Sequence, residues 1–182
     1  MPPSCATLTA FVFVAIIESA RPSILEGKQK SDEDFRQGMK TLYAVVILLA
    51  LLQSAAIAVL AKPIIRIMFG AQYGASVEAL RIIVWFTTFS YLGSVRQIWI
   101  LAENQQKYLW MINLSGATAN VVLNAVLIPA YGINGAAVAS LVTQVFTNVI
   151  MGWIIRPIRP ANRLMIQSLD IKFIRSQIRK IK

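Results

Sequence analysis

The chain has 182 residues, of which 57% are hydrophobic and 14% charged. Soluble globular domains carry about 25% charged residues, so the composition favours a membrane protein. The net charge of +10 does not indicate nucleic-acid binding. The basic residues cluster between and after apolar blocks, as they do in the cytoplasmic loops of membrane proteins. There is no His and only one Cys, Cys5, which excludes internal disulfides and Cys/His metal sites.

The N-terminal part begins with a short apolar segment, Ala6 to Ile17. A helix needs about 20 apolar residues to cross a bilayer, so this segment is too short to span alone. We interpret residues 1–25 as a partial transmembrane helix whose first half is missing, which would make Met1 an internal start or the edge of a fragment. Residues 26–40 carry both signs of charge and predict a cytoplasmic loop, with a short helix started by Ser31 and Asp32.

Four further segments predict full transmembrane helices, at residues 41–61, 79–101, 108–129 and 133–155. Lys62 and Pro63 are expected to end the first, and a turn at the membrane interface to follow. The last two come from the 48 residues between 108 and 155, which contain no charged residue. Pro129 is expected to end the first of these two helices, because it has no N–H donor, and Gly132 and Gly135 to let the backbone reverse. The predicted fold is an all-α membrane protein, a polytopic bundle of about five transmembrane helices.

The C-terminal tail, residues 156–182, has eight basic residues and one acid, Asp170. Its apolar residues recur at steps of three and four, which predicts a basic amphipathic helix on an anionic leaflet. If the connections alternate sides, one side receives fourteen basic residues and the other two. This bias predicts a cytoplasmic C-terminus in a multi-pass protein of the bacterial inner membrane.

Two arginines, Arg81 and Arg96, lie near the ends of the predicted helix 79–101. A charge within a span is costly and often lines a polar pathway. Alternatively, both side chains reach the headgroups, and Arg81 pairs with Glu78 three residues before it.

Amide side chains form stripes on the last two predicted helices. Such groups either line a hydrated cavity or hydrogen-bond between helices, and the second role is the commoner one. The stripes consist of Asn113, Asn120 and Asn124 on one helix and Gln144 and Asn148 on the next.

Small residues spaced four apart, Gly135 with Ala139 and Ala136 with Ser140, predict close helix packing. Glu18 and Glu103 are carboxylates near helix ends, and we expect them to be solvated in loops. Without His no Ser-His-Asp or Cys-His arrangement is possible, and no phosphate-binding glycine loop is present. The sequence therefore predicts neither an enzyme nor a cofactor.

Three stretches resemble the bacterial polysaccharide flippases, the O-antigen or repeat-unit transporters of the multidrug/oligosaccharidyl-lipid/polysaccharide exporter superfamily. They are Glu18-Ser19-Ala20-Arg21 followed by Leu25-Glu26-Gly27-Lys28; the segment from Lys62 to Tyr73 with its F-G-x-x-Y ending; and Leu101 to Lys107 followed by Asn120, Asn124 and the run from Ile128 to Ala139. The last run is the most specific, and the likeness extends to about Trp153.

The resemblance implies one half of a two-bundle transporter, similar to the C-terminal bundle only. It implies that an undecaprenyl-pyrophosphate-linked oligosaccharide binds in a basic cavity between the bundles and crosses the inner membrane as they rock. Arg81 and Arg96 then become candidates for a positively lined pathway. The implied partners are membrane lipids and the missing N-terminal bundle or other envelope glycan proteins. Alternatives are a non-transporting assembly subunit of envelope polysaccharide synthesis and a drug/cation antiporter fragment of the same superfamily.

Overall fold

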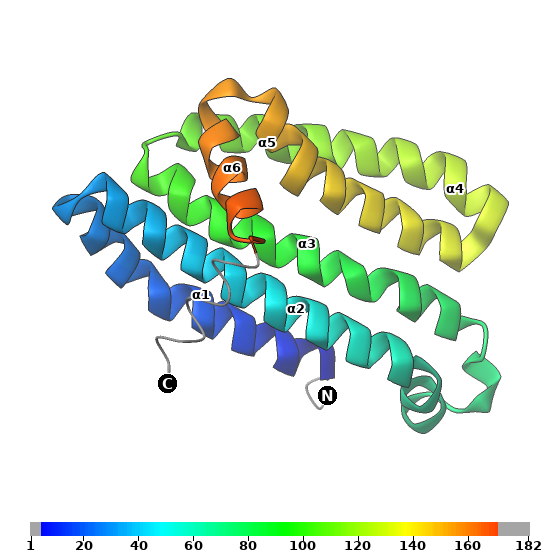
Figure 1. Ribbon diagram of the computed structural model, residues 1–182. Helices are drawn as coiled ribbons and strands as arrows, with labels where there is room; N and C mark the ends of the chain where they lie inside the picture. Colours follow the sequence, from blue (N-terminus) through cyan, green and yellow to red (C-terminus); the bar gives the residue numbers. More distant parts are fainter. Residues whose placement is uncertain (1–4, 171–182) are drawn as a thin grey trace.

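The computed structural model describes residues 5–170, with side chains described from residue 12 onward (Figure 1). Within this range the fold is all-helical and contains no strand. The helices are α1 (Cys5–Lys30), α2 (Asp32–Met68), α3 (Ser76–Ala102), α4 (Leu109–Val145), α5 (Met151–Ile154) and α6 (Arg159–Gln167). Short 3-10 turns cover Ala71–Tyr73, Gln106–Tyr108 and Arg156–Ile158, and a π-turn covers Phe146–Ile150.

The long helices run alternately in opposite directions, each beside its neighbour in the chain (Figure 1). α1 packs on α2, α2 on α3, and α3 on α4, whose two limbs form an antiparallel hairpin. One hydrophobic core joins α1, α2, α3 and the C-terminal elements, and includes Tyr43, Ile98 and Ile158. Within it the rings of Phe13 and Tyr91 stack with centroids 4.1 Å apart.

Two helical segments of the described range are long and apolar enough to cross a membrane, Asp32–Met68 and Gln106–Ile154. Many large apolar side chains on these segments are exposed, among them Leu52, Val59 and Val121. Helices that expose apolar residues are typical of proteins that face lipid.

Prolines do not end the helices as predicted. Pro63 lies inside α2, which continues to Met68, and Pro129 lies inside α4, whose first limb continues to the reversal at Gly132. Pro22 likewise lies inside α1. A proline removes one backbone hydrogen bond and bends a helix, and in apolar helices neighbouring groups compensate for that loss. Both predicted stops were therefore wrong.

The predicted loop at residues 26–40 was also wrong, because α1 runs to Lys30 and α2 begins at Asp32. The expected N-cap is confirmed: Ser31 has an extended backbone, and its Oγ accepts a hydrogen bond from the Asp34 N–H at 3.0 Å. Three acidic residues in the first turn of α2 further favour its start, because carboxylates stabilise helix N-termini. The mixed charges thus mark a turn between two helices.

The reversal of the hairpin occurs at Gly132, which has a φ of 55°. The backbone of the second limb passes so close to Leu127 at Gly135 that a Cβ there would overlap the Leu127 carbonyl. Gly132 therefore reverses the backbone as predicted, whereas Gly135 has a helical backbone and allows the close packing that was predicted from its spacing with Ala139. α6 covers part of the predicted amphipathic tail, whereas residues 171–182 lie outside the described range.

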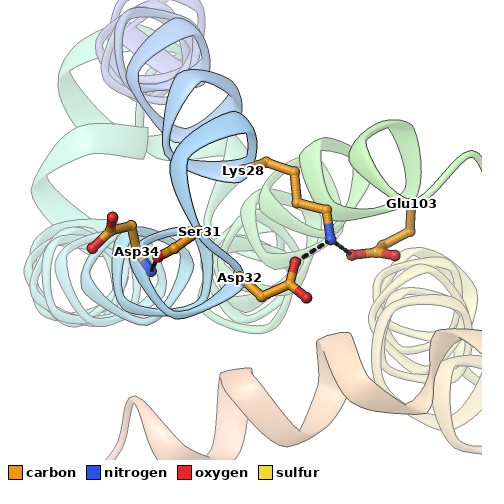
Figure 2. A network of polar contacts seen from close by, with 5 residues as sticks. All are labelled: Lys28, Ser31, Asp32, Asp34 and Glu103. Atoms are coloured by element: carbon orange, nitrogen blue, oxygen red, sulfur yellow. Dashed lines mark hydrogen bonds and ion pairs between the residues drawn. The ribbon is translucent and has the colours of Figure 1, made fainter.

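Three charged residues link the α1–α2 turn to the α3–α4 connection at one end of the bundle (Figure 2). The Lys28 ammonium donates to Asp32 Oδ1 at 2.7 Å and to Glu103 Oε1 at 2.6 Å. The hydrogen bonds to Asp32 and Glu103 raise the pKa of Lys28, and the bond from Lys28 lowers the pKa of Asp32. Glu103, expected to be solvated, instead joins α3 to the α1–α2 turn.

Replacing Glu103 with Gln should lower stability by at most about 1 kcal/mol near neutral pH, because partly exposed ion pairs contribute little. The Lys28 and Glu103 side chains are 28% and 33% exposed. A lysine whose pKa is higher in the folded than in the unfolded protein stabilises the fold fully at pH values below the unfolded-state pKa. This stabilisation is lost as the pH rises through the folded-state pKa. The difference between variant and wild type should therefore begin to shrink near pH 10.5, the ordinary lysine pKa, and vanish only above the raised pKa of Lys28 in the folded protein.

Thermal unfolding of the purified protein as a function of pH measures this effect. Glu26→Gln is the matched control, since Glu26 is exposed, lies outside the first turn of any helix and has no ion pair among the described residues. An equal loss in both variants would contradict a role for the bridge.

Candidate functional site

A polar groove of about 540 Å³ lies between α3 and the two limbs of α4. It contains five of the seven predicted pathway residues. Its polar lining consists of Ser90, Ser94, Arg96, Gln97, Asn113, Asn120, Ser140, Thr143, Gln144, Thr147 and Asn148. The groove therefore brings together side chains from both of the predicted amide stripes and from the preceding helix.

Arg96 is the only charged residue in this lining, and its side chain is only 4% exposed. Its Nη1 donates to the Asn148 carbonyl at 2.9 Å and its Nη2 to Asn148 Oδ1 at 3.2 Å. The buried Nε has no hydrogen-bond partner, and none of the ion pairs in the described range includes Arg96. Two of the five guanidinium N–H groups thus donate to dipoles of Asn148, and no carboxylate of the described residues neutralises the charge, so the cation that lines the groove favours an anion.

Asn148 lies in the π-turn Phe146–Ile150. The Met151 N–H donates to the Phe146 carbonyl, five residues back, which widens the helix at this point. Such π-bulges are frequent at functional sites, and here one presents both the carbonyl and the side-chain oxygen of Asn148 to Arg96. No sequence signal that we considered predicts this turn.

The amide stripes both line the groove and link helices. Asn120 Nδ2 donates to Thr143 Oγ1 at 3.3 Å and so joins the limbs of the hairpin, while Asn124 Nδ2 donates to Asn120 Oδ1 at 2.9 Å. Asn148 Nδ2 donates to Gln144 Oε1. Asn124 supports Asn120 and does not itself line the groove. The two roles that the sequence left open are therefore both present.

Two glycines allow the groove walls to approach each other. A Cβ on Gly93 would overlap the Asn148 amide, and a Cβ on Gly116 would overlap the Thr147 methyl group. Gly93 thus provides the space in which Asn148 meets Arg96.

Arg81 lies apart from this groove. It is 15 residues before Arg96 on α3, which corresponds to roughly 22 Å along a helix. Its Nη1 pairs with Glu78 Oε1 at 2.9 Å, as the spacing suggested, and its side chain is 44% exposed. With Lys62 and Arg66 it lines a separate pocket of about 440 Å³. The structure therefore does not bring the two predicted arginines together.

Hydroxyl groups form the part of the groove that sequence reasoning missed. Ser90 and Ser94 on α3 are four residues apart, and Ser140 and Thr143 on α4 and Thr147 in the π-turn follow one another at steps of three and four. These hydroxyls also bond to their own helices, for example Ser94 Oγ to the Ser90 carbonyl at 3.3 Å. The periodic spacing was the available signal.

The lining is suited to binding rather than to bond cleavage. One guanidinium, several amides and several hydroxyls can bind a phosphate and the hydroxyl groups of a polar ligand. The lining includes no carboxylate or thiol that could act as a base or nucleophile. Within the described residues, no group of three or more Cys, Asp or Glu side chains could hold a metal ion.

The hairpin presents a different face on its other side. An apolar groove of about 980 Å³ lies there, lined by residues such as Leu114, Val122 and Val142. The two limbs of α4 therefore together form an amphipathic hairpin, with a polar face towards α3 and an apolar face outward.

Comparisons of the chain with protein-family models, with curated proteins and with solved structures gave no match.

Proposed function

We propose that this chain is the C-terminal half-bundle of a flippase that moves a lipid-pyrophosphate-linked oligosaccharide across the bacterial inner membrane. The observation that carries the proposal is Arg96, a buried cation with no carboxylate partner among the described residues, in a polar groove between apolar helices. A charge in such a place is costly unless it has a function.

The amphipathic α4 hairpin supports a membrane-spanning bundle. Its outward residues Trp110, Val121 and Val126 are exposed apolar side chains, as lipid-facing residues are. Its inward face supplies amides and hydroxyls to the groove. This division is expected of a helix pair that separates lipid from a hydrated pathway, with the missing N-terminal bundle or another envelope glycan protein completing the wall.

The distribution of charge supports the proposed orientation. At one end of the bundle a pocket of about 550 Å³ is lined by four basic residues, Lys28, Arg36, Lys40 and Arg163, together with Asp32, Glu33 and Glu103. Three basic residues, Lys62, Arg66 and Arg81, and Glu78 line another pocket, beside the α2–α3 connection. The end with more Lys and Arg also precedes the basic tail, and since orientation follows the count of Lys and Arg, we assign this end to the cytoplasm.

In the proposed mechanism, Arg96 attracts the pyrophosphate of the carrier lipid. The guanidinium remains charged and offers several donors to phosphate oxygens. The surrounding amides and hydroxyls can exchange hydrogen bonds with successive sugar hydroxyls without holding any one of them tightly. A mixed lining of this kind favours passage over tight capture.

Binding of undecaprenyl pyrophosphate to the purified chain in detergent, measured by native mass spectrometry, tests the proposal. We expect Arg96→Gln to weaken binding by at least about tenfold, since a hydrogen bond to a charged group contributes about 1.5–3 kcal/mol. Arg81→Gln is the matched control, because it removes the same charge from the same helix outside the groove, and should change binding less than twofold.

The uncharged polyprenol serves as the second ligand. It should bind wild type and Arg96→Gln equally and more weakly than the pyrophosphate binds wild type. Equal binding of the two ligands to wild type, or an unaffected Arg96→Gln variant, would refute the assignment of the groove to a phosphate-bearing lipid.

A further inference from the structure

The carbonyl groups at the end of the last long helix accept hydrogen bonds from side chains of other elements. The Asn148 carbonyl accepts from Arg96 of α3, and the next one, of Val149, accepts from Asn162 Nδ2 of α6 at 2.7 Å. The Trp153 carbonyl accepts from Arg159 Nε, also of α6, at 2.7 Å. α3 and α6 therefore hold the same short segment from two sides.

Asn162 is buried although α6 is short and lies at the edge of the bundle. Its side chain is 1% exposed, between the buried Ala161 and Leu164. Gly152 packs so closely on it that a Cβ there would overlap the amide. A buried amide is costly unless its hydrogen bonds are made, so the bond to Val149 accounts for its place.

We infer that Asn162 is a positioning residue for the Arg96 groove, and that docking of α6 fixes the π-turn which holds the guanidinium. The carbonyls of Asn148 and Val149 belong to successive rigid peptide planes, so fixing one limits the rotation of the other. The inference rests on the proposed function only in taking the groove as the pathway.

Loss of the Asn162 bond should let the Asn148 carbonyl turn away from Arg96. The guanidinium would then satisfy its donors with water in the groove, because a charged group prefers hydration to an unpaired buried position. α6 thereby controls how strongly the cation of the groove is exposed to a ligand.

Charge-selective thiol labelling tests this coupling without any transport ligand. In a Cys5→Ser background, Ser94→Cys places a thiol in the groove lining, and its reaction rates with an anionic and a cationic methanethiosulfonate reagent are compared. We expect Asn162→Ala to raise the anion-to-cation rate ratio by at least about threefold, because the guanidinium moves towards the reagent. In an Arg96→Gln background the same substitution should leave the ratio unchanged.

Ser168→Ala is the matched control, since Ser168 is buried at the end of α6 and, among the described residues, its hydroxyl donates within its own turn, to the Met165 carbonyl. It should leave the ratio within twofold of the parent. Asn162→Ser replaces Asn162→Ala if the latter does not give a monodisperse helical protein. A ratio that stays constant or falls, or a rise that persists without Arg96, would overturn the inference. Failure of pyrophosphate binding with an intact labelling response would instead count against the proposed function alone.

Discussion

Gly135→Ala is expected to destabilise the α4 hairpin by about 3 kcal/mol or more. An added Cβ would overlap the carbonyl of Leu127 and approach the Ile128 nitrogen to 3.1 Å. These are backbone atoms of the facing limb and cannot rotate away, so the limbs must separate. The cost of such overpacking should therefore lie at the upper end of the range that is usual for added methyl groups. The thermal unfolding midpoint of the purified protein measures the loss.

Two other glycines provide matched controls for the same substitution. Gly132 has open space around it but a φ of 55° and a ψ of −131°, a combination that residues with a Cβ rarely adopt, so Gly132→Ala should cost about 1–3 kcal/mol through backbone strain alone. Gly74 has an ordinary helical backbone and ordinary contacts, so Gly74→Ala should be nearly neutral. If Gly135→Ala proved as mild as Gly74→Ala, the close approach of the limbs would be wrong.

Gly93→Ala is expected to cost about 1–3 kcal/mol and to disturb the groove itself. The new methyl group would occupy the position of the Asn148 amide, which Arg96 and Gln144 otherwise hold in place. We expect a lower unfolding midpoint together with weaker binding of undecaprenyl pyrophosphate, because Arg96 loses one of its partners.

A second substitution separates this steric effect from general damage to α3. Asn148→Ala removes the overlapping amide but keeps the backbone carbonyl that binds Arg96. The double variant Gly93→Ala/Asn148→Ala should therefore be more stable than the sum of the two single losses predicts, since contacting residues are not additive. Strict additivity would show that Gly93 and Asn148 do not meet.

The sequence predicts the general architecture because hydrophobic blocks leave few alternatives. A helix, α3, is present where residues 79–101 were predicted to form one, although it is not among the described segments that are long and apolar enough to cross a membrane. Ser31 was identified as a cap, and Gly132 as the residue at which the backbone reverses. These features depend on local chemistry, namely apolar length, a side-chain oxygen and the absence of a Cβ. The membrane, the topology and the transported ligand stay predictions.

The predictions from sequence failed for features that depend on contacts between helices or on the path of a whole helix. Pro63 and Pro129 normally favour helix ends, yet α2 continues to Met68 and the first limb of α4 continues to Gly132. The groove shows the same limit: Arg96 and Asn148 are 52 residues apart, and their contact depends on a π-turn and on the lack of a side chain at Gly93. Such a contact has no local signature.

The turn of the hairpin also bears on how the protein would be made. No ionised group lies between Leu109 and Ile154. Insertion of either limb into a bilayer would therefore transfer no side-chain charge into the hydrocarbon region. Both limbs could leave the translocon together as a preformed pair, with Asn120 already bonded to Thr143. Biogenesis of this segment would then be a single cooperative step, and a lysine placed at Tyr131 would hinder insertion before it could affect any later activity.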